Sequence, residues 1–139
     1  MKKLTSILLS AIIMLTAVVG FDLTAYAGAY DTTAKAKSYT LGTTTTGYFS
    51  SNDNIDFLKV DVPQSGRIDF TAEGTESYYI YIYPSNATED KVDYDYIYYN
   101  DNLGKAYREC YAYLVAGTYY FKVDGNYYNN SYTISSSFT

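Results

Sequence analysis

The chain has 139 residues, 20 of them tyrosine, with no histidine, no tryptophan and a net charge of −5 at neutral pH. This length suits a single domain, and the negative charge disfavours nucleic acid and anionic membranes as partners. Without histidine, neither a Ser-His-Asp nor a Cys-His catalytic arrangement can be built, and the usual His/Cys zinc sites are excluded. We therefore predict a protein that is not an enzyme.

The first 27 residues are typical of a secretory signal peptide. Lys2 and Lys3 give a basic start, an apolar run occupies residues 7–19, and the letters AYA at 25–27 match the small-x-small cleavage pattern. No later hydrophobic run is long enough to span a membrane. We expect cleavage after Ala27 and a freely secreted, extracellular protein without a membrane anchor.

The rest of the chain is typical of an all-β domain. Residues 28–37 show no periodicity and predict a short flexible leader. From residue 38 to 139, short runs of strand-forming Tyr, Thr, Val, Ile and Phe alternate with clusters of Gly, Asn, Asp, Pro and Ser. In chain order, the predicted strands are 39–41, 43–50, 56–62, 67–72, 78–83, 94–99, 107–115, 118–124 and 131–138.

Alternation along these strands assigns their side chains to two faces. Leu58, Val60 and Val62 share one face, and Tyr119 and Tyr132 fall in register with aliphatic or phenylalanine residues, so we predict that both tyrosines are in the core with their hydroxyls near its rim. A larger group of tyrosines falls opposite the core face, including Tyr79, Tyr81, Tyr83, Tyr94, Tyr96, Tyr98, Tyr111 and Tyr113.

The order of the elements resembles a known family. The stretch SYTLGTTTTGYFSSNDNIDFLKVDVPQSGRIDFTAEG resembles the opening of bacterial pre-peptidase C-terminal domains, and LVAGTYYFKVDG followed by SYTISSSF resembles their ending. The resemblance covers most of residues 38–139 and implies a small, jelly-roll-like antiparallel β-sandwich. Such domains are typically attached to secreted peptidases, and their collagen-binding relatives bind fibrous ligands through exposed tyrosines. This chain shows no peptidase domain.

Three interpretations of the outward tyrosines remain open. They brace an exposed sheet as cross-strand pairs, form a binding surface, or promote self-association. We favour a non-catalytic module that binds an extracellular polysaccharide or a fibrous protein through Tyr79, Tyr81, Tyr83, Tyr94, Tyr96 and Tyr98. Tyr111 and Tyr113 would extend this surface if their strand is a neighbour. The alternatives are a self-assembling structural protein, or a stand-alone helper or inhibitor of a secreted peptidase.

Acidic residues suggest one possible cofactor. Asp53 and Asp56 lie in one turn, where carboxylate oxygens are suitable ligands for Ca²⁺, so we predict them as the metal ligands if calcium binds. Asp93 and Asp95 share a strand face and are expected to form a solvated acidic edge, pointing away from the tyrosines. Cys110 falls on the core face, where a lone cysteine acts as a small hydrophobic residue.

Overall fold

The structure is a computed structural model that describes residues 30–50, 53–85, 90–126 and 129–139. Within these ranges ten strands form two five-stranded sheets, which confirms the predicted β-sandwich. In sheet A the order is β1 (Lys37–Tyr39), β3 (Ile55–Val62), β9 (Gly117–Gly125), β5 (Tyr78–Pro84) and β6 (Asp93–Ile97). In sheet B it is β2 (Thr44–Phe49), β10 (Asn130–Phe138), β4 (Gly66–Gly74), β8 (Lys105–Leu114) and β7 (Tyr99–Asn100).

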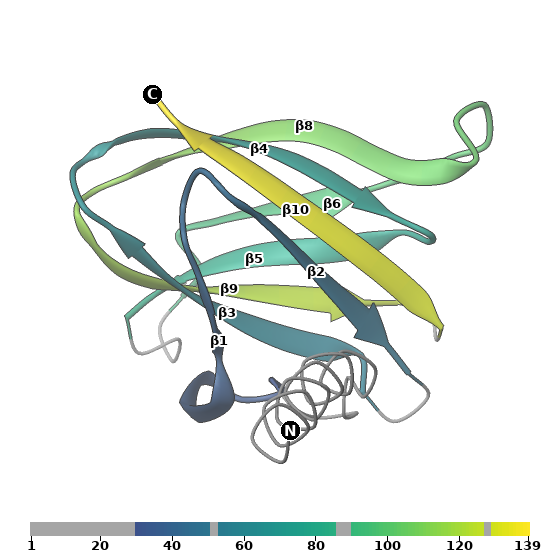
Figure 1. The fold of residues 1–139 in the computed structure, drawn as a ribbon, viewed down its shortest axis with the longest axis horizontal. Helices are drawn as coiled ribbons and strands as arrows, with labels where there is room; N and C mark the ends of the chain where they lie inside the picture. Colours follow the sequence, from purple (N-terminus) through teal and green to yellow (C-terminus); the bar gives the residue numbers. More distant parts are fainter. Residues whose placement is uncertain (1–29, 51–52, 86–89, 127–128) are drawn as a thin grey trace, which may run out of the picture.

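Most successive strands lie in opposite sheets, so the chain crosses repeatedly between the two layers in a jelly-roll-like path. Figure 1 shows β2 and β10 of sheet B in front of β3, β9 and β5 of sheet A. All strand pairs are antiparallel except β1 with β3, which run parallel. In the part of the chain that the structure describes, no helix is long and apolar enough to cross a membrane.

The core lies between the sheets and uses tyrosine as a large apolar residue. Tyr119 and Tyr132 are buried, as predicted, and Tyr78 is buried with them. The Tyr119 hydroxyl donates to the Val115 carbonyl at 3.0 Å, and the Tyr132 hydroxyl donates to Asp56 Oδ2 at 2.8 Å. Each phenol therefore buries a large ring while its hydroxyl keeps a hydrogen-bond partner, which removes the cost of burying that group.

The prediction of one strand over residues 94–99 is wrong. The chain leaves sheet A after Ile97 and joins sheet B at Tyr99, so Tyr98 lies at the crossing. The Tyr99 N–H donates to Ser77 Oγ at 2.8 Å, which fixes the crossing point beside the start of β5. Alternation in the sequence continues through this change, but in the structure Tyr99 is exposed although it shares its predicted face with buried Ile97.

Of the two predicted N-terminal segments, the structure describes only part of the second, from residue 30 onward. The predicted signal peptide, residues 1–27, lies outside the described residues. Within the predicted leader, Thr33–Lys35 form a 3-10 helix, and the Phe57 N–H donates to the Tyr30 carbonyl at 2.8 Å. The strand β1 begins at Lys37, so the end of this segment is part of sheet A.

Candidate functional site

Six of the predicted site tyrosines lie together on the outer face of sheet A and at its β6 edge. The strand β5 places its three on the side opposite buried Ile80 and Ile82, and β6 pairs beside it with Tyr96 opposite Tyr79 and Tyr94 opposite Tyr81. We call this set the tyrosine surface: Tyr79, Tyr81, Tyr83, Tyr94, Tyr96 and Tyr98. Direct cross-strand neighbours have close Cβ atoms, so the pairing register brings the rings into contact.

The rings of the tyrosine surface pack against one another. Tyr79 lies between two neighbours: its ring centroid is 5.5 Å from that of Tyr81, at an interplanar angle of 16°, and 4.3 Å from that of Tyr96. The Tyr98 ring meets that of Tyr96 edge to face at 4.3 Å. The three contacts are stacked, tilted and edge to face, in that order. Each contact covers part of a ring in the set.

Exposure differs within the set. Tyr94 is 58% exposed and Tyr98 is 59% exposed, whereas the other members are half-buried. Burial raises the pKa of Tyr81, and the nearby Asp124 carboxylate adds to the effect. The Tyr81 phenol is therefore protonated at neutral pH and available as a hydrogen-bond donor.

Two lysines lie over the tyrosine surface. Lys91 Nζ is 5.1 Å from the Tyr94 ring centroid, and Lys122 Nζ is 5.5 Å from that of Tyr81, within the range of cation–π attraction. Lys122 also pairs with Asp124 at 2.9 Å on the neighbouring strand β9. The aromatic patch therefore has charged groups of both signs at its border.

The structure adds one tyrosine that the sequence analysis missed. Tyr120 of β9 lies directly opposite Tyr83 of β5 in the sheet register and is half-buried. Its position opposite Tyr119 and Phe121 in the alternation already indicated an outward side chain. The sequence does not show that β9 pairs with β5, because these strands are far apart in the chain.

Tyr111 and Tyr113 are a correction to the predicted site. Their strand β8 pairs with β4 and β7 in sheet B, so the condition that it neighbours the tyrosine surface is not met. Both rings are exposed on the outer face of sheet B, in edge-to-face contact at 5.8 Å. These two tyrosines therefore belong to the opposite face of the molecule.

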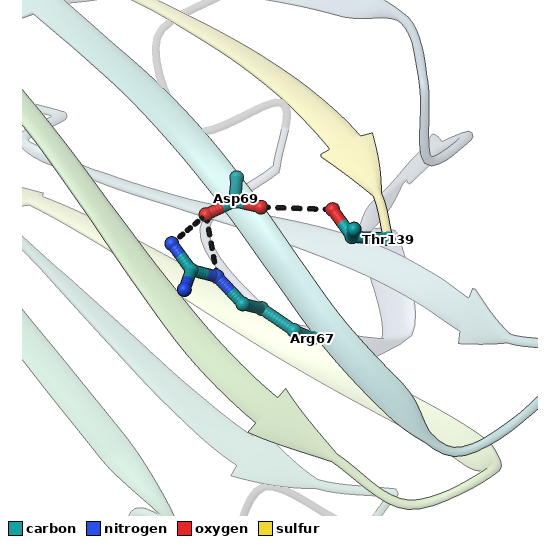
Figure 2. A network of polar contacts seen from close by, with 3 residues as sticks. All are labelled: Arg67, Asp69 and Thr139. Carbon is teal, nitrogen blue, oxygen red and sulfur yellow. Dashed lines mark hydrogen bonds and ion pairs between the residues drawn. The ribbon is translucent and has the colours of Figure 1, made fainter.

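A polar network fixes the surroundings of Tyr111. The Arg67 guanidinium lies 4.3 Å from the Tyr111 ring centroid and bonds to Asp69 Oδ1. Figure 2 shows that the other Asp69 oxygen accepts a hydrogen bond from the Thr139 hydroxyl, at 3.0 Å. Its bond with Arg67 lowers the pKa of Asp69. This network joins the end of the chain to β4 and holds a cation against the Tyr111 ring.

Asp93 and Asp95 lie on the edge strand β6 and point away from the tyrosines, as expected. Their Oδ1 atoms each accept the N–H of the following residue, Tyr94 or Tyr96, at 2.8 Å. Asp95 also pairs with Arg108 of β8 at 2.8 Å. Beside them, Cys110 packs against the core, and burial raises the pKa of its thiol to about 12. The cysteine is thus the poorly reactive hydrophobic residue that the sequence predicted.

The predicted calcium ligands are both buried. Asp56 accepts the hydrogen bond from Tyr132, and Asp53 forms a backbone bridge with Ser50. Burial raises the pKa of Asp56, and the Asp53 charge raises it further. Across the described ranges, no group of three or more His, Cys, Asp or Glu residues is placed to hold a metal. Ca²⁺ takes six to eight oxygens, so backbone carbonyls would have to complete this site, and calcium binding stays a prediction.

Comparisons with known proteins support the fold. No protein-family model matches the chain, and no curated protein matches its sequence. A solved structure, the pre-peptidase C-terminal domain of collagenase from Bacillus anthracis, matches with a TM-score of 0.56 and 19% sequence identity. The match covers 73% of this chain and 94% of that one, and the matched neighbour is a non-catalytic domain. The resemblance to this family is thus confirmed at the level of the fold: the chain has the fold of a pre-peptidase C-terminal domain.

Proposed function

We propose that this protein is a secreted, non-catalytic binding module that recognises an extracellular polymer through the tyrosine surface. The observation that carries the proposal is the joining of six tyrosines from β5, β6 and the crossing after β6 into one patch on the outer face and edge of sheet A. A contiguous aromatic patch on a domain surface is typical of an interaction site. The signal-peptide pattern in the first 27 residues supports an extracellular location.

The ring geometry favours a fibrous protein over a polysaccharide. A sugar ring stacks on the open face of an aromatic ring, but the faces of Tyr79 and Tyr96 are partly covered by neighbouring rings. Exposed ring edges suit aliphatic side chains, and phenol hydroxyls suit the carbonyl oxygens of a polypeptide backbone. Because the structural neighbour is a domain of a collagenase, collagen is the first protein matrix to test.

The test is retention of the purified protein on insoluble collagen, cellulose, xylan, chitin and peptidoglycan, each with and without EDTA. We expect retention on collagen and its loss in the Tyr81→Ala/Tyr96→Ala variant. Large buried aromatic contacts dominate binding energy, so the double substitution should weaken binding by at least tenfold. The matched control is Tyr111→Ala/Tyr113→Ala, which removes two tyrosines from the opposite face and should bind like the wild type.

Each other result has a defined meaning. Wild-type binding by both double variants would refute the assignment of the site. Retention on a polysaccharide alone would refute the choice of a protein ligand while keeping the tyrosine surface. Loss of retention with EDTA would add calcium, for which Asp53 and Asp56 are the predicted ligands. No retention on any matrix would favour the alternatives, namely self-assembly or a soluble peptidase partner.

A further inference from the structure

In the described part of the chain, the strand β8 has one side without a partner strand over much of its length. It pairs with β4 throughout, from Gly66 opposite Leu114 to Gly74 opposite Ala106, whereas β7 pairs only with Lys105 and Ala106. Among the residues that the structure describes, no strand pairs with this side of β8 from 108 to 114. In Figure 1 β8 follows the upper edge of sheet B.

One hydrogen bond shows which backbone groups of β8 point toward its unpaired side. The Tyr107 N–H donates to the Tyr98 carbonyl at 3.2 Å, so it points away from β4 and toward the side of β7. Backbone groups of a strand alternate in direction, and the β4 register has no interruption. The N–H and C=O groups of Glu109, Tyr111 and Tyr113 therefore face the free edge, and such an edge is a template for an added strand.

The facing edge of sheet A is different. The N–H groups of Tyr94 and Tyr96 in β6 already donate to the carboxylates of Asp93 and Asp95. These two donors are occupied within β6 itself, so they offer nothing to an incoming strand. The geometry of the two edges thus directs an added strand to β8.

A cavity of about 40 Å³ opens between β6 and β8. Asp93, Asp95, Cys110 and two tyrosines, Tyr94 and Tyr111, line it. The other lining residues are apolar and come from both sheets: Phe70, Ile80, Ile82, Ala112, Phe121 and Ile134. A strand added along β8 would direct every second side chain toward this cavity. The volume admits a small aliphatic side chain, because it is far below the roughly 150 Å³ that holds a benzene ring.

The charges around the cavity indicate the chemistry of the partner. Asp93 and Asp95 line it and Glu109 lies on the adjacent strand, while Arg108 is already paired with Asp95. This excess of negative charge favours a cationic side chain beside the aliphatic one. A second copy of this chain, with a net charge of −5, would bring its own acidic groups to the same place.

From these observations we propose that the free edge of β8, residues 109–113, binds an extended segment of a partner polypeptide as an additional strand. The segment places a small aliphatic side chain in the cavity and a lysine or arginine beside Asp93. This site shares Tyr94 with the tyrosine surface but uses the edge of β8, so the Tyr81→Ala/Tyr96→Ala and Tyr111→Pro variants test the two proposals separately.

The probe is the capped, fluorescein-labelled peptide Thr-Lys-Thr-Val-Thr-Lys-Thr, whose inward positions carry Lys, Val and Lys, with the glutamate peptide Thr-Glu-Thr-Val-Thr-Glu-Thr as a charge control. Binding is measured by fluorescence anisotropy on the full chain. The diagnostic variant is Tyr111→Pro, which removes an N–H that faces the edge and leaves the bonds to β4 intact. Proline is tolerated at such positions of edge strands. Tyr111→Ala is its matched control, since it loses the same ring and keeps the N–H.

We expect the lysine peptide to bind Tyr111→Pro at least tenfold more weakly than Tyr111→Ala, because both variants lose the ring that lines the cavity and only the proline variant loses the N–H. Asp93→Asn, which keeps an acceptor oxygen, should weaken the lysine peptide several-fold, and the glutamate peptide should not bind. Circular dichroism melting checks that each variant is folded.

Three results would overturn the proposal. Equal binding by the proline and alanine variants of Tyr111 would show that the edge is not used. No binding of the lysine peptide would refute the partner chemistry. A wild-type dimer in light scattering that Tyr111→Pro dissociates would assign the edge to a second copy of the chain.

Discussion

Asp56 is a carboxylate inside the sandwich with one phenol as its partner. It is 5% exposed, and Tyr132 from sheet B donates to it at 2.8 Å. Burial is the largest cause of its raised pKa, the hydrogen bond from Tyr132 opposes the shift, and the charge of Asp53 adds to it. The native state therefore binds a proton at this position more tightly than the unfolded chain does.

This linkage fixes the sign of a pH effect. A raised native pKa gives stability that is present below the ordinary carboxyl pKa of 3.8 and is lost as the pH rises through the native pKa. Asp56→Asn keeps an acceptor for Tyr132 and has no ionisation to lose. We expect it to have a higher free energy of unfolding than the wild type at pH 7, measured by urea denaturation, and the difference to shrink as the pH falls toward 3.8.

The control for this prediction is Asp61→Asn, which removes an exposed carboxylate from the same strand. If the two variants gave the same difference from the wild type at every pH, burial of Asp56 would not be the cause. Repeating the series with EDTA tests for an effect of bound metal. If Ca²⁺ binds at Asp56, EDTA should change the stability of the wild type and Asp61→Asn but not that of Asp56→Asn.

At the scale of elements, β2 depends on a glycine that faces a large ring. Gly47 lies directly opposite Tyr132 of β10, and a Cβ atom at Gly47 would come 2.2 Å from the Tyr132 ring. The ring also packs against Phe49, with centroids 5.2 Å apart, so it has little room to move. The absence of a side chain at this position therefore allows β2 and β10 to pair around the buried phenol.

We expect Gly47→Ala to lower the free energy of unfolding by about 1–3 kcal/mol, the usual cost of overpacking a core. In urea denaturation the midpoint should fall while the slope stays constant. Thr46→Ala, on the exposed face of the same strand, is the control and should change stability by less than about 0.5 kcal/mol. Equal effects of the two substitutions would mean that the Tyr132 ring moves aside without cost.

At the scale of the whole molecule, side chains close parts of the sheet edges. Asp93 and Asp95 occupy two N–H groups of β6, and Lys37 Nζ donates to the Thr46 carbonyl of β2 at 3.2 Å. Charged groups on edge strands oppose association between sheets. A tyrosine-rich domain can therefore expose its aromatic face without its β6 edge pairing with another copy.

We expect the wild type to be monomeric over a wide concentration range in light scattering, and Asp93→Ala/Asp95→Ala to form larger species, because it frees the N–H groups of Tyr94 and Tyr96. The variant Asp93→Asn/Asp95→Asn keeps acceptor oxygens and removes the two charges. Comparing it with the alanine variant shows whether the hydrogen bonds or the charges protect the edge. A monomeric alanine variant would show that these carboxylates do not protect the edge. A wild type whose mass grows with concentration would favour the self-assembly alternative.

Much of the fold and part of the site follow from local patterns. Alternation predicted the buried face of β3, the core positions of Tyr119 and Tyr132 and the outward direction of the tyrosines in β5 and β6, because a side chain's face depends only on its own strand. The crossing at Tyr98 was missed, since the sequence keeps alternating there, whereas in the structure Tyr99 is exposed and Ile97 is buried.

The sequence by itself determined an all-β domain with a tyrosine-containing core and a second set of tyrosines facing outward. The tertiary structure alone decided which outward tyrosines meet: β5 lies between β6 and β9, which adds Tyr120, while β8 lies in the other sheet, which removes Tyr111 and Tyr113. It also decided that β8 has no partner strand on one side from 108 to 114 among the residues described. The physical reason is that each strand's face is set by its own residues, whereas pairing between distant strands is set by how all of them pack around one core.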